Sequence, residues 1–197
     1  MIQKYLKYLN KIRVLYVEDN SYTREELVSF LENKVFELYV AKNGEEGLEI
    51  YKDKSPDLVI TDVRMPKLDG ISMSSFIKDY DANAKIIVLT AFNDSEYLFD
   101  AIKLNIDHYI TKPLDIKILV KVMVKIAKNI FLEKENEEIY NIISQYKDIV
   151  DERSIVSKTN KNGVITYINK PFEEISGYSN AEIVGKTHAF LRHEDMN

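Results

Sequence analysis

The sequence predicts an α/β protein built on a doubly wound parallel sheet. Between residues 11 and 128, short runs of strand character alternate with segments whose apolar residues have helical spacing. Several of these runs end in a carboxylate, a hydroxyl or a lysine. The carboxyl ends of parallel strands meet at one edge of such a sheet, so the chemistry of the protein is expected at that edge.

The elements follow from simple patterns. Strands are expected where β-branched and other apolar residues run together, at Arg13–Val17, Glu37–Ala41, Leu58–Thr61, Lys85–Thr90 and His108–Thr111. Helices are expected where apolar residues recur every three or four positions, at Ser21–Asn33, Glu45–Lys54, Ser72–Tyr80 and Ser95–Lys103. Residues 1–10 show the same helical spacing, which predicts a short packing helix before the sheet domain at residues 11–128.

A long helix is expected after Pro113. It can run from Asp115 to about Val150, because this stretch contains no Gly or Pro. Its first half is apolar almost everywhere outside one polar stripe, which consists of Lys117, Lys121, Lys125 and Lys128. One domain core covers only one sector of a helix, so a second copy of the chain is the simplest partner for the remaining sector. The alternative is a single helix packed back on its own domain.

The second half of this helix has a different pattern. Apolar residues repeat there at heptad-like spacing, at Ile139, Ile142, Tyr146 and Ile149. Residues 129–152 are therefore predicted to form a helical linker with a short coiled coil, and a homodimer is expected through this helix. The lysine stripe is interpreted as a solvated helix face, because the acidic balance of the chain disfavours phosphate contact.

Residues 153–197 change character. Strands are expected at Ile155–Thr159 and Val164–Asn169, on either side of the turn signal Asn162-Gly163. Two short helices are expected at Pro171–Ser176 and Asn180–Val184. Two strands and two short helices make a poor core, so this segment is predicted to be an incomplete α+β domain.

Composition excludes several classes of function. The net charge of −5 argues against a general nucleic-acid binder, and no nucleic-acid partner is expected. The chain has no cysteine, so it has no disulfide framework and no cysteine-ligated metal. No apolar run reaches the length of a membrane span, and the first ten residues are too polar for a signal peptide. A cytoplasmic protein without a membrane partner is expected.

The strand ends carry a set of chemically matched residues. Glu18 and Asp19 follow the first strand, Asp62 follows the third, Thr90 ends the fourth and Lys112 follows the fifth. Three carboxylates close together need a hard cation, and Mg²⁺ fits because it takes few protein carboxylates and keeps waters and a phosphate oxygen. The ammonium and the hydroxyl are suited to neutralising a phosphoryl group as it passes to an attacking carboxylate.

These residues, together with Met65-Pro66, Asp69-Gly70 and Lys112-Pro113, resemble the receiver domain of bacterial two-component response regulators. The resemblance covers residues 11 to about 128 and implies a flavodoxin-like fold with five strands. It also implies that Asp62 accepts a phosphoryl group from a phosphohistidine on a sensor histidine kinase.

The resemblance further implies a role for each site residue. Mg²⁺ ligands would be Asp19, Asp62 and the backbone carbonyl of Arg64, with Glu18 close by. Thr90 and Lys112 would each contact a phosphoryl oxygen. Tyr109, three residues before Lys112, matches the aromatic residue that switches together with Thr90.

The segment from Asn162 to Asn169, followed by Phe172, Gly177-Tyr178 and Gly185, resembles the first half of a PAS sensory domain. The predicted function is therefore a response regulator in a His-Asp phosphorelay, which relays its state through the long helix to a PAS or output region. Its only chemistry would be self-catalysed phosphoryl transfer. Two alternatives remain: the regulatory front end of a larger enzyme, such as a diguanylate cyclase or a histidine kinase, or a docking receiver that is not phosphorylated.

Overall fold

The computed structural model describes residues 7–91 and 106–191, with the side chains of the last two left out. The chain divides into two compact units, Met1–Glu133 and Lys134–Asn197. The helix expected at Ser95–Lys103 lies outside the described residues. Of the short helix expected at residues 1–10, the structure describes only the end, where a 3-10 turn, η1, spans Leu9–Lys11.

The first unit contains the predicted parallel sheet. Its strands run in the order β2-β1-β3-β4-β5, and all neighbouring pairs are parallel. Their bounds are β1 Arg13–Val17, β2 Glu37–Ala41, β3 Leu58–Asp62, β4 Ile86–Thr90 and β5 His108–Thr111. Strand β3 extends one residue beyond the expected end because Asp62 still pairs with Leu89 of β4. This arrangement confirms the flavodoxin-like fold class for the sheet domain.

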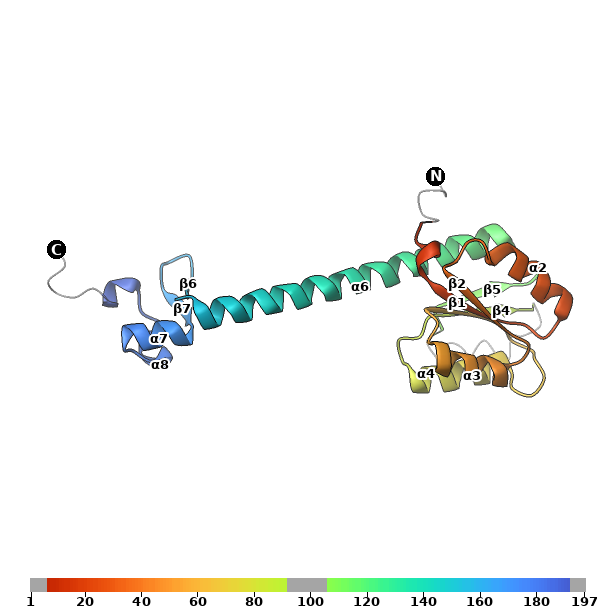
Figure 1. The fold of residues 1–197 in the computed structure, drawn as a ribbon, viewed down its shortest axis with the longest axis horizontal. Helices are drawn as coiled ribbons and strands as arrows, with labels where there is room; N and C mark the ends of the chain where they lie inside the picture. Colours follow the sequence, from red (N-terminus) through yellow and green to blue (C-terminus); the bar gives the residue numbers. More distant parts are fainter. Residues whose placement is uncertain (1–6, 92–105, 192–197) are drawn as a thin grey trace. The chain divides into compact units, whose positions relative to one another are not determined.

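Helices cover both faces of this sheet. Figure 1 shows α2 and the first part of α6 on one face, with α3 and α4 on the other. The bounds are α2 Ser21–Leu31, α3 Gly44–Lys54, α4 Gly70–Tyr80 and α6 Ile116–Arg153. The side chains of Asn20, Asn43 and Asp69 accept hydrogen bonds from the first turns of α2, α3 and α4 and so fix where these helices begin.

The first half of α6 is covered by its own domain, so the uncovered apolar sector expected there is not found. Its core-facing side chains join the cluster formed by the sheet, α2 and the N-terminal segment, and they are Leu119, Met123, Ile126, Ala127 and Ile130. The ring of Tyr8 packs on Phe131 at 5.5 Å between centroids, which extends this cover. Of the large apolar residues in 116–131, only Ile118 is strongly exposed.

The second unit contains the rest of α6 and a small α+β segment. Strands β6 Ser157–Thr159 and β7 Ile165–Ile168 are antiparallel, and α7 Lys170–Ser176, α8 Asn180–Ile183 and the 3-10 turn η2 His188–Leu191 follow. Among the residues described there, four side chains form the buried core: Ile165, Ile168, Phe172 and Ile183. Within the parts that the structure describes, no helix is both long and apolar enough to cross a bilayer.

One asparagine joins the elements of the second unit. Asn169 is 3% exposed, and its amide nitrogen donates to the carbonyls of Asp151 and Ser154 at the end of α6. Its amide oxygen accepts from the backbone N–H groups of Val156 and Phe172. A single side chain therefore ties the end of α6 to the hairpin and to the first turn of α7.

Candidate functional site

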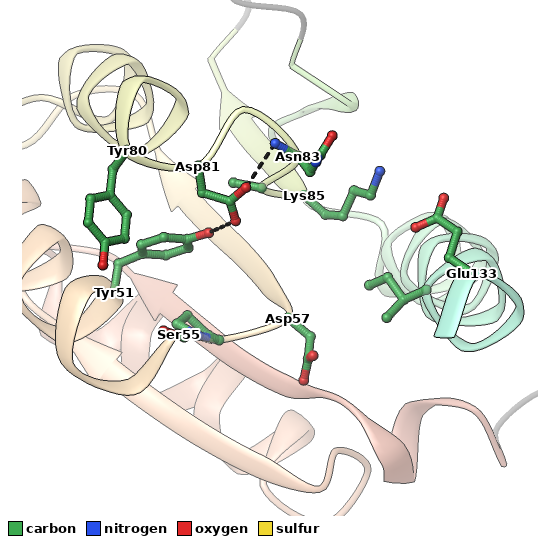
Figure 2. Close-up of a pocket in the computed structure, with 11 residues that line it drawn as sticks. Tyr51, Ser55, Asp57, Tyr80, Asp81, Asn83, Lys85 and Glu133 are labelled. Carbon is green, nitrogen blue, oxygen red and sulfur yellow. Dashed lines mark hydrogen bonds between the residues drawn. The ribbon is translucent and has the colours of Figure 1, made fainter. Parts of the chain in front are cut away.

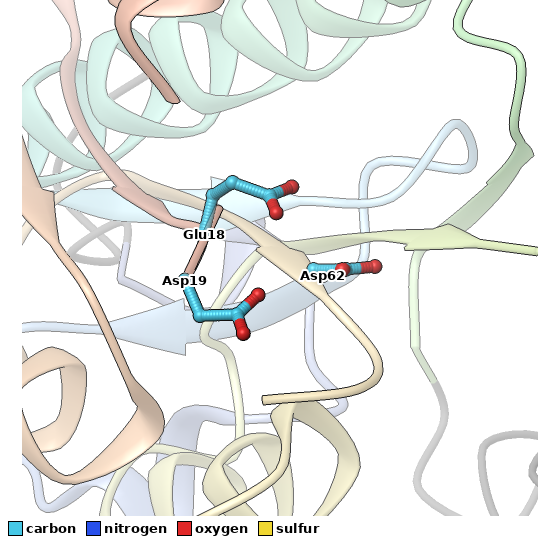
Figure 3. A group of neighbouring side chains, drawn as sticks. All are labelled: Glu18, Asp19 and Asp62. Atoms are coloured by element: carbon cyan, nitrogen blue, oxygen red, sulfur yellow. The ribbon is translucent and has the colours of Figure 1, made fainter. Parts of the chain in front are cut away.

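Three carboxylates meet at the carboxyl edge of the sheet. Glu18 and Asp19 follow β1, and Asp62 ends the adjacent strand β3. One carboxylate oxygen from each residue lies within 4.8 Å of the other two. Figure 3 shows these side chains leaving neighbouring strand ends with their carboxylates turned to the same side. The sequence prediction that these residues come together is confirmed.

Lys112 bridges two of the carboxylates. Its Nζ lies 2.9 Å from Asp62 Oδ2 and 3.0 Å from Glu18 Oε2. Burial by itself would lower the pKa of Lys112, but the hydrogen bonds and charges of Asp62 and Glu18 outweigh it, so the pKa is raised. The ammonium therefore stays charged and partly offsets the repulsion among the acids.

Glu18 is the most enclosed of the three acids. It is 1% exposed, and its other oxygen accepts from the backbone N–H of Asn20 at 3.3 Å. Burial raises the pKa of Glu18, while the hydrogen bond from Lys112 opposes this rise. The buried hydroxyl of Tyr16, two residues earlier on the same strand, lies 3.5 Å from Glu18 Oε2. Glu18 thus sits at the inner side of the group.

Asp62 is more accessible than Glu18. Its Oδ1 accepts from the backbone N–H of Val63 at 2.9 Å, and its side chain is 14% exposed. The loop after β3 folds back under it, because Gly70 N–H donates to the Val63 carbonyl. A Cβ at Gly70 would lie 1.9 Å from the Asp62 carbonyl oxygen, so only glycine allows this approach. Arg64 is exposed in this loop, two residues beyond β3.

Thr90 and Tyr109 lie on the next two strands. Thr90 ends β4 with 8% exposure, and its carbonyl accepts from the backbone N–H of Lys112 at 2.7 Å. Tyr109 of β5 pairs with Val88 and packs partly buried against the α3 and α4 side of the sheet. Its hydroxyl is buried without a hydrogen-bond partner among the residues described, and burial raises its pKa to about 12.

Arg24 is part of this neighbourhood although the sequence motif did not single it out. Its Nη1 donates to the carbonyls of Glu18 at 2.7 Å and Asp19 at 3.0 Å. A cation in the first turn of a helix is disfavoured by the helix dipole. Arg24 is the fourth residue of α2, and its unfavourable position was a signal available in the sequence.

A pocket of about 240 Å³ lies elsewhere on the first unit, where Tyr51, Asp57, Asp81 and Lys85 line it. Figure 2 shows that Asp81 is already engaged, since its carboxylate accepts from the Tyr51 hydroxyl at 2.9 Å and from Asn83 N–H. Asp57 accepts from Arg13 N–H at 2.8 Å. These groups stabilise the loops around them and do not converge on a ligand.

The donor set at the carboxylates fits a hard divalent cation. It offers several oxygens from Glu18, Asp19 and Asp62 with no sulfur or imidazole, and Mg²⁺ prefers such ligands. The buried face is closed by Lys112 and the exposed face is open beside Asp19, which is solvent-exposed. A cation and an incoming anionic group could therefore both be accommodated from the solvent side.

Comparison with known proteins identifies the same region. The family of the response regulator receiver domain matches residues 14–124. The chain is 43% identical over 101 residues to the chemotaxis protein CheY of Halobacterium salinarum, and this alignment covers 51% of this chain and 84% of that protein. It is 38% identical over 102 residues to CheY of Bacillus subtilis, covering 51% of this chain and 85% of that protein.

Solved structures agree. The N-terminal domain of an uncharacterized protein from Wolinella succinogenes matches with a TM-score of 0.59 and 35% identity, covering 62% of this chain and 98% of that one. The complex of CheX, CheY, BeF3 and Mg²⁺ from Borrelia burgdorferi matches with a TM-score of 0.54 and 30% identity, covering 58% of this chain and 87% of that one.

Proposed function

Because the chain belongs to the response regulator receiver family through residues 14–124, we propose that it is a response regulator in a His-Asp phosphorelay. Asp62 accepts a phosphoryl group from a phosphohistidine of a sensor histidine kinase. The observation that carries this proposal is the strand-end Asp62, bonded to Lys112 at 2.9 Å and grouped with two further carboxylates. The similarity to CheY proteins supports the same role.

The transfer needs little covalent machinery. Val63 N–H holds one oxygen of Asp62, so the other oxygen can attack phosphorus. A P–O bond forms while the P–N bond of the phosphohistidine breaks and the imidazole leaves with its electron pair. Lys112, already 2.9 Å from Asp62, then pairs with a phosphoryl oxygen, and the Thr90 hydroxyl bonds another.

Asp19, Asp62 and the backbone carbonyl of Arg64 would hold Mg²⁺, with Glu18 close by. Bound there, the ion would neutralise charge on the equatorial phosphoryl oxygens. The oxygen-only donor set supports this assignment, as does the presence of Mg²⁺ in the CheX–CheY complex of the Borrelia relative.

Thr90 and Tyr109 form the switch. Movement of Thr90 toward a phosphoryl group on Asp62 opens space beside β4, and the Tyr109 ring moves further inward. The buried hydroxyl of Tyr109, which has no partner among the described residues, supports this role because its present position is not fixed by a hydrogen bond. Such a side chain has two accessible arrangements that phosphorylation can bias.

Helix α6 relays this change to residues 153–197, which act as the first half of a PAS-type sensory region. The chain forms a homodimer through residues 129–152. The exposed heptad residues of the second unit support this interface, and they are Ile139, Ile142, Tyr146 and Ile149, with exposures of 48%, 52%, 66% and 55%. A partner helix would remove this apolar surface from water.

The test is intact-mass measurement after incubation with acetyl phosphate, with and without Mg²⁺, on the wild type and on Asp62→Asn. The proposal expects a phosphoryl mass gain that requires both Mg²⁺ and Asp62. An equal gain in Asp62→Asn would contradict it. No gain with acetyl phosphate or with a phosphorylated histidine kinase would favour a docking receiver that is not phosphorylated.

A further inference from the structure

The backbone of the acidic pair is held by one arginine. Arg24 Nη1 reaches back from α2 to the carbonyl of Glu18 at 2.7 Å and to that of Asp19 at 3.0 Å. Both contacts are charge-assisted hydrogen bonds at short distances. We infer that Arg24 is a positioning residue for the proposed Mg²⁺ site, an assignment that rests on the proposed function. It fixes the direction in which the carboxylates of Glu18 and Asp19 leave the chain.

The surrounding contacts explain why this hold is needed. On the side of the sheet, Glu18 N–H donates to the Ala41 carbonyl of β2. On the side of the helix, Asn20 caps α2 by accepting from Thr23 N–H. Between these anchors, the peptide groups after Glu18 and Asp19 bond through Arg24, and a rotation of either group would turn the adjacent side chain away from Asp62.

The position of Arg24 also has an energetic cost that a merely structural role does not explain. The first turn of α2 carries no acidic residue that could pair with it locally. A cation at a helix N-terminus is unfavourable, because it lies at the positive end of the helix dipole. The guanidinium instead lies against the carbonyls of two acids whose carboxylates converge with that of Asp62.

The direction in which Mg²⁺ affinity changes when Arg24 is removed therefore distinguishes the two explanations. If its charge were the only effect, Arg24→Gln would remove a positive charge near the site and bind Mg²⁺ more tightly. If Arg24 positions the ligands, the same variant binds Mg²⁺ more weakly, because binding must then order the loop. Residues that orient metal ligands indirectly change affinity by about 10- to 100-fold, and we expect about tenfold here.

Arg13 offers a matched control, because it begins β1, the strand whose other end leads into Glu18 and Asp19. Its Nη1 also donates to a backbone carbonyl, that of Lys54 at 2.9 Å, and its Nε lies 3.4 Å from Asp57. Arg13→Gln removes the same chemical group from the same unit without touching the acidic pair. It is expected to lower the melting temperature and to leave Mg²⁺ affinity unchanged.

The experiment is calorimetric titration of Mg²⁺ into the metal-free chain of 197 residues, with thermal unfolding in a chelator as the stability readout. Arg24→Gln should raise the dissociation constant about tenfold, and Arg24→Lys, which keeps the charge but lacks the planar fork, should fall in between. Equal or tighter binding by Arg24→Gln in a folded protein would overturn the inference. If Arg24→Gln does not fold, Arg24→Lys decides alone: unchanged affinity would overturn the inference.

The outcome also separates this inference from the proposed function. A wild-type chain that binds no Mg²⁺ would contradict both the proposed magnesium site and the role of Arg24 in positioning it. Wild-type binding combined with an unaffected Arg24→Gln variant would overturn the role of Arg24 alone.

Discussion

The two units of this chain bury their apolar residues to very different extents. In Met1–Glu133, large clusters fill both faces of the sheet, and two of the acids at its edge, Glu18 and Asp62, are paired with Lys112. In Lys134–Asn197, the described residues form a core of four buried side chains, while the heptad residues of α6 remain exposed. The first unit therefore buries most of its apolar residues within its own core, whereas the second leaves a row of apolar side chains exposed that the proposed dimer would cover.

The largest expected effect tests whether the exposed apolar residues of the second unit form a dimer interface. Ile142→Glu combined with Ile149→Glu should abolish the proposed dimer, because like charges would face each other across the seam. Light scattering should change from twice the chain mass of 23.0 kDa to the mass of one chain. The control is Tyr140→Glu, which removes a side chain of 75% exposure outside the heptad seam and should remain dimeric. A wild type that is already monomeric would contradict the proposed interface.

A methyl group at Gly70 tests how tightly the first unit is packed. Gly70→Ala places a Cβ 1.9 Å from the Asp62 carbonyl and should cost about 3 kcal/mol in unfolding free energy, measured by urea denaturation. Gly163→Ala in the second unit meets no atom within 4 Å, but its φ of 76° should cost about 1 kcal/mol. If Gly70→Ala and Gly163→Ala lower the unfolding free energy equally, steric crowding at the Asp62 loop does not explain why glycine occupies position 70.

Asn169→Asp should loosen the second unit and leave the first unchanged. The variant replaces the amide that donates to Asp151 and Ser154 with an acceptor, at an expected cost of about 2 kcal/mol. Hydrogen exchange should accelerate in residues 156–172 and not in β1 or β3. Asn160→Asp is the matched control, because the Asn160 side chain only accepts, from Asn162 and Val164 N–H. Equal acceleration in both variants would contradict the role of the amide donor.

The smallest expected effect concerns a buried polar group in the first unit, the hydroxyl of Tyr109. Tyr109→Phe removes a buried hydroxyl that has no partner among the described residues, so it should stabilise the unphosphorylated chain by about 1 kcal/mol. Thermal or urea unfolding measures this change. A loss of stability would show that the hydroxyl has a partner and would weaken the case for Tyr109 as a mobile switch.

Sequence reasoning worked best where chemistry and strand periodicity coincide. Asp62, Thr90 and Lys112 each follow or end an apolar run, and parallel strands necessarily bring such ends to one edge. It could not find the contacts of Arg24, because a side chain bonded to backbone carbonyls leaves no pattern of residue types. Only its position in the first turn of a helix was a signal.

The long helix α6 shows what sequence reasoning could not predict about burial. Its first half was expected to leave an apolar sector uncovered, but η1, α2 and the sheet together cover more of it than one packing face would. How much of a helix its own domain covers depends on how the N-terminal segment folds over it. Periodicity within the helix carries no information on that cover.

The most direct test of the account locates the phosphoryl group. After phosphorylation in Mg²⁺, borohydride reduction converts an aspartyl phosphate to homoserine. Tryptic digestion then releases residues 55–64, which contain two acids, Asp57 and Asp62. The account predicts homoserine at Asp62 alone, since Asp57 is held by Arg13 away from the site. Homoserine at Asp19, Asp57 or any other acid, with Asp62 unmodified, would contradict it.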